Sequence, residues 1–304
     1  MIAYPAKFQD LCAAAELAKA GWLARAAAVT ETYRQQQDYT PNALSWSDIK
    51  SVFTTLQHGK CAYCERGLAD PELGAKEHEI EHYRPKSSIK VWPSEAMRRE
   101  ADSPYGKAPY TKLVSGDAAD KGYYLLAYNL RNYAVACTAC NSSLKSNYFP
   151  VADKRVLATD DYAQLANEKP YLLFPVGDVD GHKPEDLITF EGILPIPKFK
   201  TGWRNLRARV TIDFFKLAIR EDLLVQRARI LLNIWLAHRT LKTSADEADR
   251  ADAEEILRLA QLAGFPHSNC TRTFLRLCQT DETRAGQYKE AAKQFLKSRN
   301  GLNP

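Results

Sequence analysis

The chain has 304 residues, of which 45% are hydrophobic and 26% charged, and its formal net charge is +5 at pH 7. This length suits one large domain or two ordinary ones, and the charge is compatible with nucleic acid as a partner without requiring it. Because no apolar run reaches the ~18 to 20 residues of a membrane span and the first residues do not resemble a signal peptide, we expect a cytoplasmic protein without a membrane partner.

The first predicted elements are helices. Residues 8–37 are rich in good helix formers and contain no proline, which predicts one helix, or two helices broken near Gly21. Ser45 and Asp48 have the spacing of a capping box, and apolar residues follow at helical spacing until Gly59. We therefore expect an N-terminal helical segment over residues 1–45.

The rest of the chain divides into a central and a C-terminal region. Prolines among polar residues at 86–121 predict a long loop within a central module at 46–155. A proline-rich connection then leads to a helical region over 156–304, a possible partner-docking surface, with helices expected at 203–240, 245–263 and 283–297. The acidic run at 246–255 is a solvated helix face or, as the alternative, a partner surface.

Four of the seven cysteines form two C-x-x-C pairs, Cys61 with Cys64 and Cys137 with Cys140. Thiols of a cytosolic chain stay reduced, and four thiolates are the preferred ligands of structural Zn²⁺. A redox C-x-x-C motif is the alternative, but the residues before Cys61 do not supply its strand–helix setting. We predict one structural zinc site, and we expect buried apolar roles for Cys12, Cys270 and Cys278.

A second set of residues has the chemistry of phosphodiester hydrolysis. Glu81 directly precedes His82, and Asn141 directly follows Cys140. An imidazole that titrates near neutrality can deprotonate water, while carboxylate and amide oxygens can hold Mg²⁺ or Mn²⁺. Each residue alone also has an ordinary explanation, since Glu–His pairs are often exposed and an Asn often caps a helix. Their order between the two cysteine pairs favours the catalytic interpretation.

These motifs resemble those of the HNH (ββα-metal) nucleases that carry two zinc knuckles. The resemblance lies in Cys61-x-x-Cys64, Glu81-His82-x-x-Pro85 and Asn132-x-x-x-x-Cys137-x-x-Cys140-Asn141-x-x-x-Lys145. The chain is also similar to the HNH subunit of Septu antiviral defence systems (PtuB-like). That similarity lies in residues 61–65, 81–86 and 140–142, and in Phe149-Pro150.

The resemblance implies an α+β, mainly helical fold with a central ββα-metal HNH module between N- and C-terminal helical regions, stapled by one zinc ion on the four cysteines. It implies a hairpin that carries His82 as general base, a loop in which Asn132 braces that hairpin, and a short helix that begins near Asn141. Glu81 and Asn141 are then the ligands of the catalytic cation. Glu81 stands where Asp is common, and Asn129 competes with Asn132 for the middle role.

Three basic residues inside the motifs, Arg84, Lys86 and Lys145, are the predicted phosphate contacts. We expect a metal-dependent endonuclease that acts on DNA, or alternatively RNA, as the effector of an antiphage defence system. By resemblance it works with an ATPase partner (PtuA-like), and this chain has no phosphate-binding Walker loop of its own. The alternative is a non-catalytic zinc scaffold that binds nucleic acid or a partner. We expect His78 to be a surface residue.

Overall fold

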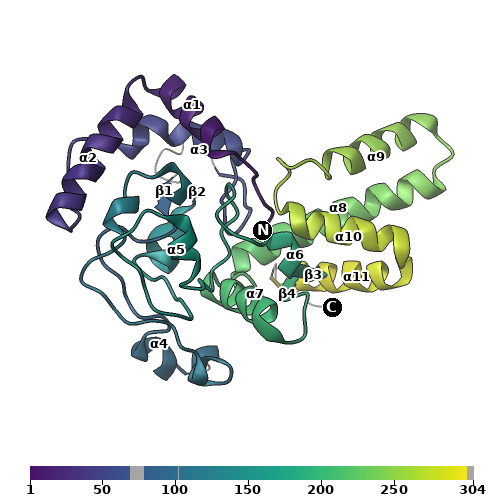
Figure 1. Cartoon of the computed structure of the whole chain (residues 1–304). Helices are drawn as coiled ribbons and strands as arrows, with labels where there is room; N and C mark the ends of the chain where they lie inside the picture. Colours follow the sequence, from purple (N-terminus) through teal and green to yellow (C-terminus); the bar gives the residue numbers. More distant parts are fainter. Residues whose placement is uncertain (69–78, 102, 300–304) are drawn as a thin grey trace. The chain divides into compact units, whose positions relative to one another are not determined.

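The computed structural model describes residues 1–68, 79–101 and 103–299, so His78 lies outside the described residues. The fold is α+β, about half helical, with two small antiparallel sheets, and the predicted class is confirmed at that level (Figure 1). In these ranges no helix combines the length and the apolar character that crossing a membrane requires.

The chain forms two compact units. Unit 1 consists of Met1–Ala3, His58–Gly67 and His182–Pro304, and unit 2 consists of Tyr4–Gln57 and Leu68–Gly181. The division at 1–45, 46–155 and 156–304 stays a prediction, because compactness does not test which segment carries which function.

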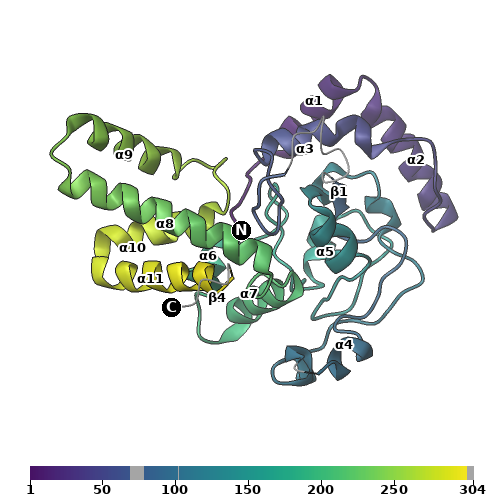
Figure 2. The same ribbon diagram turned by 180° about the vertical axis from the view of Figure 1, so that it is seen from behind.

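Unit 2 begins with the helices that the sequence predicts. Gly21 separates the first two helices with a φ of +70°, which glycine adopts without a Cβ penalty. The Ser45 hydroxyl accepts a hydrogen bond from the Ser47 N–H (3.1 Å) and so caps the next turn. Helix α1 packs against α2 and α3 (Figure 2). The bounds are α1 (Phe8–Ala18), α2 (Trp22–Gln36), a 3₁₀ turn (Trp46–Ile49) and α3 (Lys50–Leu56).

The sheet of unit 2 pairs β1 (Glu79–His82) with β2 (Tyr133–Ala136), antiparallel, with His82 opposite Tyr133. The chain between the strands is mainly loop, as expected, with the short helix α4 (Glu95–Arg99) and several 3₁₀ turns. A helical segment, Ala139–Lys145, follows β2, and α5 (Tyr162–Ala166) comes later. In chain order, segment 79–82 is therefore a strand, and segment 133–145 is a second strand followed by a helical segment.

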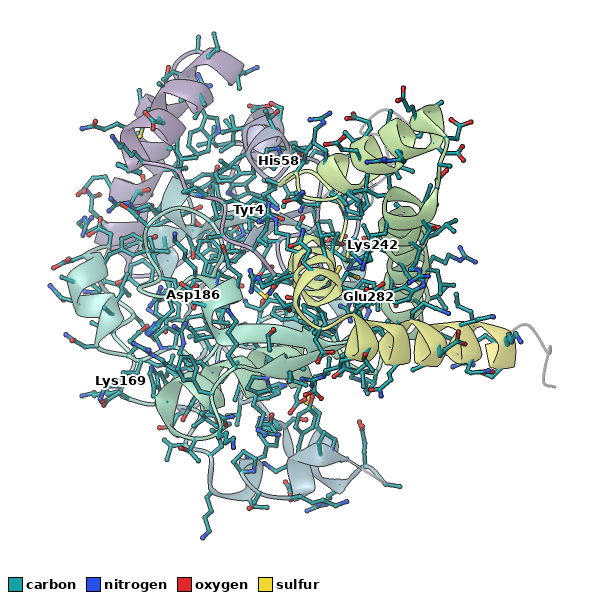
Figure 3. The ribbon with its side chains drawn as sticks, turned by 90° about the vertical axis from the view of Figure 1, so that its right-hand side faces the viewer. Tyr4, His58, Lys169, Asp186, Lys242 and Glu282 are labelled. Atoms are coloured by element: carbon teal, nitrogen blue, oxygen red, sulfur yellow. The ribbon has the colours of Figure 1, made fainter. Side chains whose placement is uncertain are left out.

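Unit 1 contains one sheet and the C-terminal helices. Helix α8 packs against α9, α10 and α11, and Lys242 of α8 forms an ion pair with Glu282 of α11 (Figure 3). The bounds are α6 (Pro184–Leu187), β3 (Ile188–Glu191), β4 (Leu194–Pro197), α7 (Gly202–Phe214), α8 (Glu221–Thr243), α9 (Glu247–Leu259), α10 (Ser268–Thr280) and α11 (Glu282–Arg299).

Three features of unit 1 differ from the prediction. The helix expected at 203–240 is two helices, α7 and α8, because the chain turns at Lys216, whose φ is +51°. Helix α10 was not predicted because its first residues, Ser-Asn-Cys-Thr, are poor helix formers, and burial of Phe274 and Leu275 stabilises it instead. Strands β3 and β4 lie in the proline-rich stretch expected to be a connection.

Candidate functional site

Four cysteine side chains form a buried cluster. Cys61 lies in a tight turn, in which its N–H donates to the Arg66 carbonyl (3.0 Å) and its own carbonyl accepts from the Glu65 N–H (3.0 Å). Cys137 follows β2 directly, and its carbonyl accepts from the Asn141 N–H (2.9 Å). The sulfur atoms of Cys61, Cys64, Cys137 and Cys140 all lie within 4.8 Å of one another, and all four residues are buried.

The cluster fits a metal ion. Tetrahedral Zn²⁺ with Zn–S bonds of ~2.3 Å places its ligand sulfurs about 3.8 Å apart, which the observed upper limit of 4.8 Å accommodates. Soft thiolates favour zinc over Mg²⁺ or Ca²⁺. The predicted four-cysteine set is therefore confirmed as a group that could hold a metal ion.

A buried polar network supports the first cysteine turn. Glu65 has a φ of +61°, and its carboxylate lies 3.9 Å from the Lys60 ammonium. Its carbonyl accepts a hydrogen bond from the His267 N–H (3.0 Å). Burial lowers the pKa of Lys60 to about 8 and that of His267 to about 3, so the imidazole of His267 is neutral at pH 7.

His82, at the end of β1, is buried between two aromatic rings. The ring centroids of Trp46 and Tyr133 lie 4.9 Å and 5.0 Å from the imidazole, both edge-on. The Nε2 atom of His82 is 3.1 Å from the Ala127 carbonyl, which can only accept, so Nε2 carries the proton and Nδ1 has the lone pair. Burial, and then the charge of Lys86, hold the pKa of His82 well below its usual value.

Glu81 forms a buried ion pair with Lys145. The Lys145 Nζ is 3.2 Å from Glu81 Oε1, and it also donates to the His82 carbonyl (3.2 Å). Both side chains are almost fully buried. Burial lowers the pKa of Lys145, while the Glu81 charge opposes that shift. Lys145 therefore holds the Glu81 carboxylate and the end of β1 in place.

The two candidate asparagines differ in their contacts. Asn132 accepts from the Arg84 N–H (2.8 Å) and donates to the Arg84 carbonyl (3.0 Å), which extends the β1–β2 ladder beyond His82. The side chain of Asn129 accepts from the Arg131 N–H (3.0 Å), its carbonyl accepts from the Asn132 N–H (2.9 Å), and the residue so caps the turn at Leu130–Asn132. Asn132 thus contacts the chain just beyond the strand that carries His82, and its bracing role stays a prediction.

Asn141 meets a carboxylate that the sequence reasoning missed. Its Nδ2 donates to Glu79 Oε2 (2.5 Å), and the hydroxyls of Thr138 and Ser142 donate to the same carboxylate (2.8 and 2.7 Å). In the described ranges, Asn141 Oδ1 accepts no hydrogen bond. Glu79 and Glu81 share one face of β1, because alternate residues of a strand point the same way, and that periodicity could have indicated Glu79.

The predicted phosphate contacts have different environments. Arg84 is buried, with its Nε 3.2 Å from Glu168 and its Nη2 3.0 Å from the Leu165 carbonyl, so contact with phosphate would break this pair. Lys145 is engaged with Glu81. Lys86 is half-buried, with its Nζ 4.5 Å from the Trp46 ring centroid, and it is the one of the three that remains suited to a phosphate.

The fold and these contacts define an α+β chain with a four-cysteine cluster that could hold a metal ion and a buried histidine whose pKa burial lowers. No family model matches the chain, and no solved structure matches it. The chain is similar to Septu protein PtuB of Bacillus mycoides (strain KBAB4), with 26% identity over 212 residues, which are 69% of this chain and 60% of that protein. The match covers less than two thirds of the length of that protein. The similarity confirms the resemblance to the Septu subunit that the motifs indicated.

Proposed function

We propose that the chain is a metal-dependent HNH endonuclease that hydrolyses phosphodiester bonds in nucleic acid, with DNA favoured over RNA. The observation that carries the proposal is the state of His82. Its Nε2–H is held by the Ala127 carbonyl, which leaves Nδ1 as a base on the same strand as two carboxylates. A neutral imidazole in a fixed tautomer is what general-base activation of water requires.

In this proposal each polar residue has one role. His82 takes the proton of the attacking water at Nδ1, and Asn132 keeps the end of β1 in register. Glu81 and Asn141 would hold the catalytic cation through their oxygens, and Glu79 would be a further ligand or orient the Asn141 amide. Bound Mg²⁺ or Mn²⁺ supplies charge stabilisation at the scissile phosphate.

The four-cysteine cluster has a structural role in this proposal. Four thiolates complete a tetrahedral zinc site and leave no position for substrate. An ion held there would fix the turn at Cys61 and the start of the helical segment that carries Asn141. In this proposal zinc would be required for folding, and Mg²⁺ or Mn²⁺ for cleavage.

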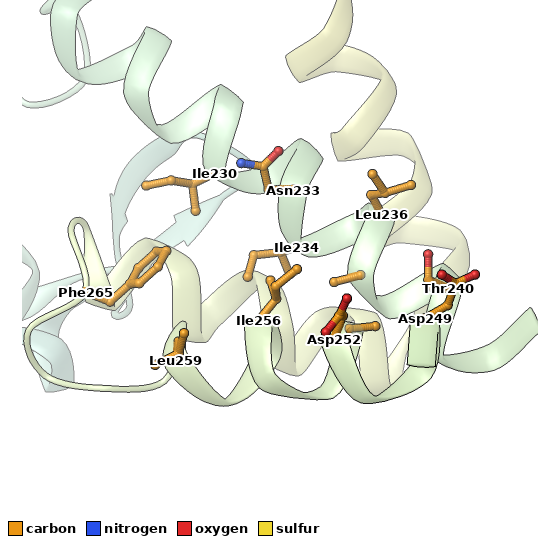
Figure 4. A pocket seen from close by; sticks show the side chains of 12 residues that line it. Ile230, Asn233, Ile234, Leu236, Thr240, Asp249, Asp252, Ile256, Leu259 and Phe265 are labelled. Carbon is orange, nitrogen blue, oxygen red and sulfur yellow. The ribbon is translucent and has the colours of Figure 1, made fainter. Parts of the chain in front are cut away.

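The similarity to Septu protein PtuB supports a role in antiphage defence, with an ATPase subunit (PtuA-like) as the partner. A surface suited to a partner lies between α8 and α9. This groove of about 470 Å³ is lined by apolar side chains such as Ile234, Leu236 and Ile256. Figure 4 shows Phe265 at one end of the groove and Asp249 at the other.

The groove fits an amphipathic helix of the partner. Leu236 and Ile256 are 66% and 47% exposed, which is more than expected of apolar side chains that belong to a hydrophobic core. Acidic side chains of α9 border the groove, among them Asp249 and Asp252, so the matching helix presents apolar residues flanked by Lys or Arg. We assign that helix to the ATPase partner.

A non-catalytic zinc scaffold is the second candidate, favoured by the deep burial of His82 and by the Lys145 charge on Glu81. A cleavage assay separates the two. Zinc-loaded protein, with its partner and Mg²⁺, is incubated with plasmid DNA and with labelled RNA. We expect His82→Ala to lower the cleavage rate by ~10² to 10⁴, since general-base help is lost.

His238→Ala, a histidine on α8, is the matched control and should cleave like the wild type. If the wild type and His82→Ala bind zinc and the partner equally, and neither cleaves any substrate, the scaffold function is correct and the nuclease function is wrong.

A further inference from the structure

One short segment of unit 1 concentrates positive charge. Residues 198–216 contain six Lys or Arg residues and one Asp, in a chain whose overall net charge is only +5. Four of these cations, together with the phenyl ring of Phe199, lie on the exposed surface between the end of β4 and the middle of α7. We call this set the β4–α7 patch: Lys198, Phe199, Lys200, Arg204 and Arg209.

The cations of the patch are not neutralised. Across the described ranges, none of Lys198, Lys200, Arg204 and Arg209 has a carboxylate within ion-pair distance. Many other exposed cations of the chain do, for example Arg34 with Asp160 (2.8 Å) and Arg258 with Glu255 (2.6 Å). A group of unpaired cations creates a positive potential that attracts a polyanion.

The patch also borders a hollow in the surface. This hollow of about 430 Å³ is lined by Phe199, Lys200, Asn205 and Arg209, together with apolar residues and one acidic residue, Asp213. The Arg204 guanidinium lies 5.3 Å from the centroid of the Phe199 ring, which is 37% exposed. Thr201 does not cap α7 with its side chain, so the first turn of this helix adds a favourable dipole for an anion.

We propose that the β4–α7 patch binds the phosphate backbone of nucleic acid and gives the chain sequence-independent affinity for its substrate. This inference deepens the proposed nuclease function and rests on it for the class of ligand. Two of the three basic residues expected to contact phosphate, Arg84 and Lys145, are occupied in buried ion pairs. Lys86 alone of the three remains suited to a phosphate, and the patch adds four more cations that can contact the backbone without breaking an ion pair.

The test is a binding measurement on the full chain that carries His82→Ala, so that cleavage does not intervene. Fluorescence anisotropy with labelled duplex DNA, single-stranded DNA and RNA of one sequence is recorded from ~50 to ~200 mM salt. We expect Lys200→Ala/Arg209→Ala to weaken binding on the order of tenfold. The slope of log affinity against log salt should fall by about 2, since two phosphate contacts are lost.

The matched control is Arg250→Ala/Lys293→Ala, which removes the same charge from exposed positions on α9 and α11. It should bind with nearly the affinity and salt slope of the parent. Equal losses in both double variants would mean that only net charge matters, and no loss in the patch variant would mean that the patch serves another anion, such as an acidic protein; either result overturns the inference. Since cleavage is not measured, an inactive nuclease would leave the binding result unaffected.

Discussion

One carbonyl oxygen decides which nitrogen of His82 can accept a proton. The Ala127 carbonyl receives the indole N–H of Trp46 (3.0 Å) and the Tyr133 hydroxyl as well as His82 Nε2. Ala127 lies 45 residues from His82 along the chain, a separation that no local motif connects. The sequence motif therefore indicates that a histidine stands at position 82, but only the tertiary packing determines which of its nitrogens carries the proton.

Lys145 offers a test of the buried ion pair. We expect Lys145→Met to lower the free energy of unfolding by about 3 to 5 kcal/mol, because Glu81 would stay buried without its cation. Urea unfolding of the zinc-loaded protein measures it. The double variant Glu81→Gln/Lys145→Met removes both charges and should recover most of the loss. A loss below about 1 kcal/mol for Lys145→Met alone would mean that the pair is effectively solvated.

His267 should make stability depend on pH. Its folded-state pKa is about 3, below the ordinary value near 6.5, so between these values the unfolded chain binds the proton and the folded chain does not. Stability is therefore full above about pH 6.5 and falls as the pH is lowered. From pH 7 to 5 we expect this residue to account for about 2 kcal/mol of the loss.

His267→Gln, measured by chemical denaturation at both pH values, should show a correspondingly smaller loss than the wild type. Gln cannot titrate but keeps an amide that can pair with Gln226, which lies 3.0 Å from the imidazole Nε2. An unchanged pH dependence would show that the proton binds elsewhere.

At the scale of elements, the sequence predicts what local chemistry determines. Gly21 marks the break between α1 and α2, and Ser45 marks the start of a helical turn, because each acts within a few residues. Strands β3 and β4 and helix α10 depend on distant partners. Asn269 of α10 donates to the Ile188 carbonyl (3.0 Å), a contact that no local pattern reveals.

The same distinction holds for the candidate site. Cysteine spacing predicts the four-cysteine cluster, because two C-x-x-C pairs have few other roles in such a chain. Burial of Arg84 and Lys145 was not predictable, since a basic residue inside a motif can face either solvent or a buried carboxylate. Glu168, which forms the ion pair with Arg84, lies far from Arg84 along the chain.

The groove between α8 and α9 gives a prediction at this scale. We expect Leu236→Ser/Ile256→Ser to abolish association with the proposed ATPase partner in co-purification, because the exposed apolar faces of both helices would lose their contacts. Ile219→Ser is the matched control, since Ile219 is 70% exposed and does not line the groove. Unimpaired association of the double variant would place the partner on another surface.

At the scale of the whole molecule, metal content and folding should be coupled. We expect about one zinc per chain by elemental analysis, and a large loss of thermal stability after chelation, because an ion on the four cysteines would tie separate positions of the chain together. Cys61→Ser/Cys140→Ser should bind no zinc, whereas Cys12→Ser, outside the cluster, should bind as the wild type does. Full zinc content in the double variant would contradict the four-cysteine assignment.

The most direct measurement is a divalent-cation titration of cleavage by zinc-loaded wild type, His82→Ala and Asn141→Ala, each with the ATPase partner. Asn141→Ala removes a cation ligand, so raised Mn²⁺ should partly restore its activity. His82→Ala removes the base and should stay ~10² to 10⁴ below the wild type at every Mn²⁺ concentration. Wild-type-like cleavage by His82→Ala, or its rescue by Mn²⁺, would contradict the proposed mechanism.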